Sequence, residues 1–189
     1  YIDALIKEKQ FDNAKQVLER AKKRNVDQKQ LSVVEIRLKE TVQISPLQEQ
    51  LTRLVEHYQT GRLIEAEKLA VSVTQEFPKH PFSWKVLGAL LQAVGRYSEA
   101  ADANQKAVDL SLQDADAHYN LGNTLKALGR FGEAEASYNQ AISLKHDFAD
   151  AHYNLGNTLK ELGRLDEAEA SCKRAIALKP DYAEAHNNL

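Results

Sequence analysis

The sequence has little of what several large protein classes require. It contains a single cysteine, Cys172, so no disulfide can form within the chain. No apolar run approaches the roughly 20 residues that a membrane-spanning helix needs. The formal net charge is −2, whereas nucleic-acid binding depends on positive charge that neutralises phosphates. We therefore expect no membrane or nucleic-acid partner, and a reducing, cytoplasmic compartment is compatible with this composition.

Sequence motifs of catalytic and cofactor sites are also missing. There is no Gly-rich phosphate loop, no G-x-S-x-G, no H-E-x-x-H and no C-x-x-C. The acids Glu133 and Glu135, like Glu167 and Glu169, open second helices, where they favour the helix dipole. We interpret them as residues of a solvated face. The sequence thus predicts a chain with no catalytic residue and no cofactor.

Three histidines recur every 34 residues: His118, His152 and His186. A row of this kind could suggest a metal site. None of them has a second histidine four residues on, which chelation from one helix would need. Each stands in the slot that Trp84 takes in an earlier block. We interpret them as partly buried structural residues and expect no metal.

What the sequence does contain is a repeat. Residues 115–148 read ADAHYNLGNTLKALGRFGEAEASYNQAISLKHDF, and residues 149–182 read ADAHYNLGNTLKELGRLDEAEASCKRAIALKPDY. The two blocks are identical at 25 of 34 positions. A period of 34 is typical of a repeated helical hairpin.

Apolar and small residues explain how one block folds. Leu121 and Leu125 recur at helical spacing in its first half, and Gly129 suits the left-handed end of that helix. Small residues stand where two helices would have to approach to about 8–10 Å; they are Gly122, Ala134 and Ala141. One hairpin cannot bury its apolar stripe alone, so neighbouring hairpins are expected to stack.

The same positions resemble the tetratricopeptide repeat family. Its signature residues in the first block are Leu121, Gly122, Gly129, Ala134, Tyr138 and Ala141, and in the second Leu155, Gly156, Gly163, Ala168, Cys172, Ala175 and Pro180. The resemblance implies an all-α solenoid of helical hairpins wound as a right-handed superhelix. Its repeats would cover about 47–80, 81–114, 115–148 and 149–182, with a partial repeat at 183–189. Because the chain starts without Met and its last repeat stops part-way, we expect a fragment of a longer protein.

The repeat register begins at residue 46. The spacing predicts a helix over 31–42, and Ser45-Pro46 then separates it from the next helix, with Pro46 in its first turn. Residues 1–45 are predicted as an N-terminal helical segment, either a degenerate repeat or a cap. The sequence leaves both alternatives open.

In this family the first helix of each repeat lines a concave groove. Carried over residue by residue, the resemblance implies groove positions at Asp116, Asp150 and Glu184, and a peptide-binding set of Tyr119, Asn120, Asn123, Lys126, Tyr153, Asn154, Asn157, Lys160 and Asn188. The Asn-rich helix is similar to those of O-linked N-acetylglucosaminyltransferases, where groove asparagines hold substrate peptides. A carboxamide both donates and accepts hydrogen bonds, so it can pair with a peptide backbone. We therefore hypothesise a ladder of Asn120, Asn154 and Asn188 along an extended peptide. The alternative is that these polar residues belong to the repeat consensus and bind nothing.

Recognition of acidic chaperone tails is disfavoured. That mode requires basic groove residues, and Asp150 and Asn154 stand in their places. The leading hypothesis is a protein–protein interaction module without catalysis of its own. Two alternatives stay open: the substrate-recruiting region of a larger transferase, and a scaffold that self-assembles into a homo-oligomer through an uncapped array end.

Overall fold

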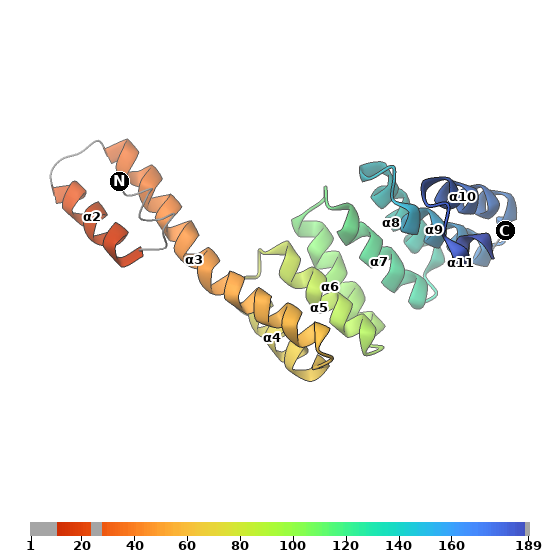
Figure 1. The fold of residues 1–189 in the computed structure, drawn as a ribbon, viewed down its shortest axis with the longest axis horizontal. Helices are drawn as coiled ribbons and strands as arrows, with labels where there is room; N and C mark the ends of the chain where they lie inside the picture. The colour runs from red at the N-terminus through yellow and green to blue at the C-terminus, as the bar shows by residue number, and fades with distance from the viewer. Residues whose placement is uncertain (1–10, 24–27, 188–189) are drawn as a thin grey trace. The chain divides into compact units, whose positions relative to one another are not determined.

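A computed structural model of the chain describes residues 11–23 and 28–187. Over these residues the secondary structure is helical, without strands (Figure 1). Of the helices in these two ranges, none combines the length and apolar character that crossing a bilayer requires. The chain divides into two compact units, one up to Glu56 and one from His57 onward, and each is described by itself.

The first unit holds α2 (Phe11–Lys23) and most of α3 (Gln28–Gln59). One core cluster of this unit contains four buried residues from the two helices, Ala14, Leu18, Leu31 and Leu38. Lys22 forms an ion pair with Glu35 at 3.4 Å and so links the two helices across the surface. An amphipathic helix pair therefore forms here, while its kinship to the repeats stays a prediction.

The expected helix break at Ser45-Pro46 is wrong. Helix α3 runs without interruption from Gln28 to Gln59, with Pro46 inside it. A proline in a helix interior removes one hydrogen bond and crowds the preceding turn, at a cost of about 3 kcal/mol. The turns on either side keep their own hydrogen bonds, so a helix of 32 residues can continue through it. The proposed boundary between residues 45 and 46 therefore does not coincide with a helix end, and the division into a segment and an array stays a prediction.

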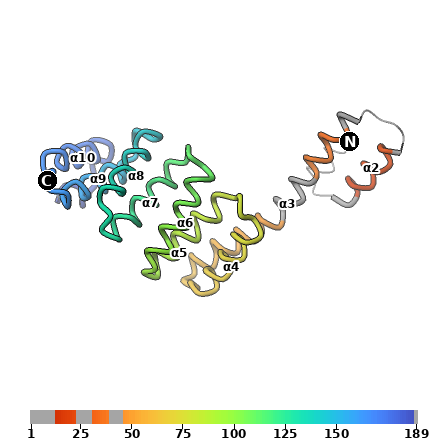
Figure 2. The backbone as a smooth tube through the Cα atoms, turned by 180° about the vertical axis from the view of Figure 1, so that it is seen from behind, coloured from red at the N-terminus to blue at the C-terminus, as the bar shows by residue number. Residues whose placement is uncertain are grey.

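The second unit is a row of helical hairpins (Figures 1 and 2). After α4 (Leu63–Glu76) come three complete pairs: α5 (Pro81–Ala93) with α6 (Tyr97–Leu110), α7 (Ala115–Ala127) with α8 (Phe131–Leu144), and α9 (Ala149–Glu161) with α10 (Leu165–Leu178). A short α11 (Ala183–His186) follows. Each second helix also contacts the next first helix, and the first helices α5, α7 and α9 contact one another in sequence. The hairpin solenoid predicted from the sequence is confirmed.

The turn inside each hairpin follows from one glycine. Gly129 has φ +73°, a left-handed conformation that a residue with a Cβ rarely adopts. This lets the Arg130 amide donate back to the Leu125 carbonyl at 2.9 Å, closing the last turn of α7. The predicted glycine turn is confirmed, and it repeats at Gly95 and Gly163.

Close approach between the two helices of a hairpin also depends on small residues. A Cβ added to Gly122 would lie 2.7 Å from Cε1 of Tyr138, so the ring packs directly on the α7 backbone. Ala134, Tyr138 and Ala141 are fully buried. The predicted roles of Gly122, Ala134 and Ala141 are therefore confirmed, and Tyr138 is positioned to extend its hydroxyl toward the first helices.

Candidate functional site

The candidate residues lie on two neighbouring first helices. We call the surface shared by α5, α7 and α9 the first-helix face. Tyr119, Asn120, Asn123 and Lys126 are half-buried on α7; Tyr153, Asn154 and Asn157 are half-buried on α9, and Lys160 is exposed there. Asn188 lies outside the described residues. Hydrogen bonds bring Tyr119, Asn123 and Lys126 of α7 together with Asn154 of α9.

Asn154 is held by three residues of the preceding repeat. Its Nδ2 donates to the Tyr119 hydroxyl at 2.9 Å and to Oδ1 of Asn123 at 3.2 Å. Its Oδ1 accepts from Nζ of Lys126 at 2.7 Å. Both amide hydrogens and the carbonyl oxygen are therefore engaged between α7 and α9.

Asn123 connects this surface network to the core. Its Oδ1 accepts from the hydroxyl of Tyr138 at 2.8 Å as well as from Asn154. Tyr138 is fully buried, so its hydroxyl needs such a partner. The network thus runs from the buried ring on α8, through α7, to α9.

Asn120 has the same place in its repeat but different surroundings. Its backbone carbonyl accepts from Oγ1 of Thr124 at 3.0 Å and from Nδ2 of Asn104 at 3.4 Å. Within residues 11–23 and 28–187, its half-buried side chain makes no hydrogen bond. Its carboxamide is open to solvent and to a ligand.

Aromatic pairs flank the asparagines, and sequence reasoning missed half of each. Tyr119 packs against Phe148, with ring centroids 4.8 Å apart, and Tyr153 packs against Tyr182 at 5.0 Å. Lys145 lies over the Phe148 ring, and Lys179 over the Tyr182 ring, at 4.5 and 4.6 Å. The signal was present in the sequence as an aromatic residue one period apart, at positions 148 and 182.

The electrostatics of the site reflect its partial burial. Burial lowers the pKa of Lys126, an effect that nearby Glu161 opposes. Burial raises the pKa of Tyr119, and the negative charge of Asp150 acts in the same direction. Burial raises the pKa of Tyr182, and the negative charge of Asp150 acts in the same direction. The site therefore carries neutral tyrosines beside an acid, with Lys126 bound to an amide.

His118 is buried and His152 is half-buried, in line with the prediction of partly buried histidines, whereas His186 is exposed. His118 Nε2 contacts the carbonyl of Leu112 at 3.1 Å, and His186 Nε2 contacts that of Pro180 at 2.9 Å. In the equivalent slot, Trp84 Nε1 donates to the Pro78 carbonyl at 2.9 Å. Each ring secures the turn between hairpins. In the part of the chain that the structure describes, no group of histidine, cysteine and acidic residues could hold a metal ion.

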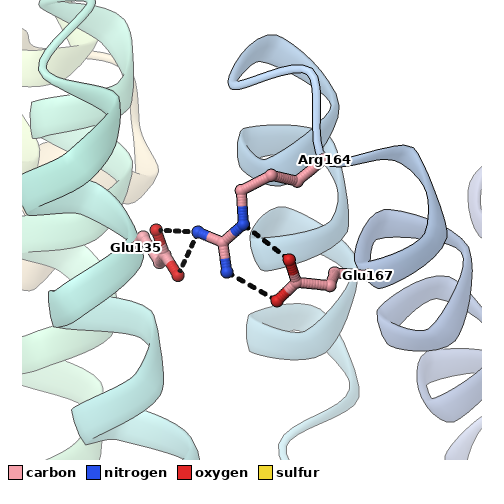
Figure 3. Close-up of polar contacts among 3 residues, drawn as sticks. All are labelled: Glu135, Arg164 and Glu167. Atoms are coloured by element: carbon pink, nitrogen blue, oxygen red, sulfur yellow. Dashed lines mark hydrogen bonds and ion pairs between the residues drawn. The ribbon is translucent and has the colours of Figure 1, made fainter.

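The acids at the starts of second helices are paired rather than free. Arg164 donates to Glu167 in its own helix at 2.5–2.7 Å, and to Glu135 of the preceding hairpin at 2.7–2.8 Å (Figure 3). Arg96 links Glu99 and Glu67 in the same way. In each case one arginine forms ion pairs with two glutamates, one of them in the preceding hairpin. We call these groups arginine clamps, and they join successive hairpins. Glu133, Glu167 and Glu169 are exposed, as expected for a solvated face, whereas Glu135 is half-buried.

Comparison with known proteins agrees with this architecture. Family models described as "TPR repeat" match residues 90–129 and 122–163, and one described as "Tetratricopeptide repeat" matches residues 149–182. No curated protein sequence matches the chain.

Solved structures with similar folds include several tetratricopeptide proteins. One of them is a crystal structure of MamA, which is 25% identical in sequence. The match covers 70% of this chain and 78% of the MamA chain, with a TM-score of 0.67. The first TPR domain of Spaghetti (RPAP3), bound to an HSP90 peptide, is 28% identical, with 58% and 86% coverage and a TM-score of 0.57. The O-GlcNAc transferase of Thermobaculum terrenum is 26% identical, with 71% coverage of this chain, 26% of that chain and a TM-score of 0.65. The hairpin row, the glycine turns and the family-model matches together identify residues 90–182 as tetratricopeptide repeats.

Proposed function

We propose that the chain is a protein-interaction module that binds an extended peptide, or an extended segment of a partner protein, on the first-helix face. The surface proposed for binding is made up of Tyr119, Asn120, Asn123, Lys126, Tyr153, Asn154, Asn157, Lys160 and Asn188. The observation that carries the proposal is the half-buried carboxamide of Asn120, which makes no hydrogen bond within the described residues, on the same helix as the half-buried Tyr119. An amide can pair with peptide backbone, and tyrosine supplies apolar contact area.

Geometry supports an extended ligand. Packed helices lie about 8–10 Å apart, and three residues of extended chain span about 10 Å. Equivalent side chains on α7 and α9 can therefore meet every third residue of one strand of peptide. The ligand would need no helical structure of its own.

The ligand is not expected to be an acidic tail. The similar RPAP3 domain holds an HSP90 peptide of sequence SRMEEVD, which ends in acidic residues. In this chain Asp116 and Asp150 stand on the first helices, and Lys126 already binds Asn154. Acidic residues of a ligand would meet like charge there, which disfavours binding.

A second candidate function is substrate recruitment for a larger transferase. It is favoured by the likeness to the O-GlcNAc transferase structure, of which this chain covers 26%. The full-length sequence would distinguish a transferase region from an independent interaction module. The peptide-binding surface would be the same in both.

The test is a peptide array probed with the 189-residue chain, followed by fluorescence anisotropy on the tightest peptide. Asn120→Ala should weaken its binding about three- to tenfold, the usual worth of one hydrogen bond, with unchanged thermal unfolding. Asn139→Ala, an exposed asparagine on α8, is the matched control and should bind normally. If no peptide binds, or if Asn120→Ala binds as tightly as the parent chain, the proposal fails.

A further inference from the structure

Two asparagines at the same repeat position are in different hydrogen-bonding states. Asn154 uses both amide hydrogens and its oxygen, in bonds to Tyr119, Asn123 and Lys126. The Asn120 side chain makes none within the described residues. A peptide meeting this face would find one amide already occupied and one available.

The preceding repeat explains the difference. The three partners of Asn154 lie 35, 31 and 28 residues before it. The same offsets before Asn120 hold Lys85, Ala89 and Gln92. Ala89 has no polar side chain, Lys85 is paired with Asp114 at 2.7 Å, and Gln92 Oε1 accepts from Thr124 at 3.2 Å. In the part of the chain that the structure describes, none of these three side chains hydrogen-bonds to the side chain of Asn120.

We propose that the two asparagines have different tasks: Asn120 contacts the ligand, whereas Asn154 is a positioning residue that joins α7 to α9 and fixes Tyr119 and Lys126 on the first-helix face. This inference rests on the proposed function and makes it more specific. Whether a groove asparagine is available is decided by the side chains 28, 31 and 35 residues earlier. The ladder hypothesis, in which both asparagines serve equally, is replaced by one open position and one closed position.

The two asparagines differ in the hydrogen bonds that each would have to break in order to bind a peptide. For Asn154 to bind a peptide amide, it must release Tyr119, Asn123 or Lys126. Releasing Lys126 leaves a half-buried ammonium without its acceptor, and such an unpaired polar group is costly. Asn120 exchanges only water for the ligand. A peptide therefore gains more from Asn120 than from Asn154.

The first experiment reads the two side-chain amides by NMR in the intact 189-residue chain. Before ligand is added, the Asn154 amide protons should exchange with solvent more slowly than those of Asn120. Adding the tightest peptide from the array should shift the Asn120 amide signals and leave those of Asn154 in place. An Asn154 shift as large as that of Asn120, or loss of its protection from exchange, would overturn the assignment.

The second experiment closes the open position. Ala89→Asn combined with Gln92→Lys gives Asn120 two of the three partners that Asn154 has. The double variant should slow exchange of the Asn120 amide and weaken the same peptide about three- to tenfold, although Asn120 itself is unchanged. Ala93→Asn, at the exposed end of α5, is the control and should bind normally.

The outcomes separate the two proposals. If the parent chain binds no peptide, the proposed function fails. If it binds but the folded double variant binds equally well, only the division between Asn120 and Asn154 fails. Should the double variant not fold, the NMR comparison on the parent chain decides alone.

Discussion

At the scale of single residues, the repeat depends on a few positions where backbone and side chain meet without a gap. Gly122 is one, because the Tyr138 ring fills the space that a Cβ would take. Gly156 is another, because a Cβ added there would lie 2.7 Å from Sγ of Cys172. Cys172 is buried and its pKa is raised by burial, so it packs rather than reacts.

We expect Gly122→Ala to lower the free energy of unfolding by about 2 kcal/mol. The added methyl group would overlap the Tyr138 ring, which is fully buried and bonded to Asn123 and cannot easily move. The gain in helix propensity, about 1 kcal/mol, offsets only part of this. Urea unfolding followed by circular dichroism measures the difference.

Gly132→Ala is the matched control for that change. Gly132 lies in α8, and a Cβ there would meet nothing within 4 Å. Only the gain in helix propensity remains, so the free energy of unfolding of this variant should exceed that of the parent by about 0.5–1 kcal/mol. Equal effects at residues 122 and 132 would show that the close contact with Tyr138 does not matter.

At the scale of elements, successive hairpins are joined by arginine clamps, and one of them is incomplete. Arg96 reaches Glu67 and Arg164 reaches Glu135, each 29 residues earlier. The position 29 residues before Arg130 is Ala101, which carries no acid, and within residues 11–23 and 28–187 Arg130 forms its ion pair with Glu133 alone. The boundary between α6 and α8 therefore lacks a link that its neighbours have.

We expect Ala101→Glu to complete the third clamp. Glu67 and Glu135 occupy the equivalent repeat position and pair with Arg96 and Arg164, so a glutamate at residue 101 should be able to reach Arg130 in the same way. Ala101 is buried, but the Arg130 side chain that the new carboxylate would reach is 49% exposed, so the midpoint of thermal unfolding should rise by only about 1 °C, and 1 M NaCl should remove the gain. Ala101→Gln, with the same shape and no charge, should give no salt-sensitive increase. A rise that persists in salt would point to packing instead.

At the scale of the whole molecule, we expect stability to depend on pH through two histidines, His80 just before α5 and His152 in α9. Burial lowers the pKa of His152 below its usual 6.5, and Arg174 acts in the same direction. The unfolded chain therefore binds more protons at this residue than the folded chain between these two pKa values. The free energy of unfolding must then fall as the pH drops through 6.5 toward the lower folded value.

This predicts less stability at pH 5.5 than at pH 7.5 in urea unfolding, with His80 contributing in the same sense because burial lowers its pKa too. His152→Gln keeps an amide donor without a titrating ring and should reduce the dependence. Glu99, Glu133 and Glu167 have lowered pKa values, so their contributions are lost only below about pH 4.5 and do not overlap this range. An unchanged dependence in the variant would exclude His152 as its source.

Much of the fold could be predicted because the repeat uses local rules. Helical spacing of Leu121 and Leu125 and the left-handed Gly129 are properties of short segments, and both are confirmed. Helix α3 is the exception. Pro46 predicted a helix break from local sequence, but the helix continues through it from Gln28 to Gln59. The aromatic partners Phe148 and Tyr182 were missed because their contacts cross about 29 residues.

The sequence by itself determined the period, the hairpins and which side chains share the first-helix face, because a 34-residue repeat returns each side chain to the same place on successive helices. It made Asn120 and Asn154 equivalent. Only the tertiary structure decided that Asn154 is engaged and Asn120 is open. Hydrogen bonds between hairpins depend on the residues of the preceding repeat, and those residues differ where the repeated asparagine does not.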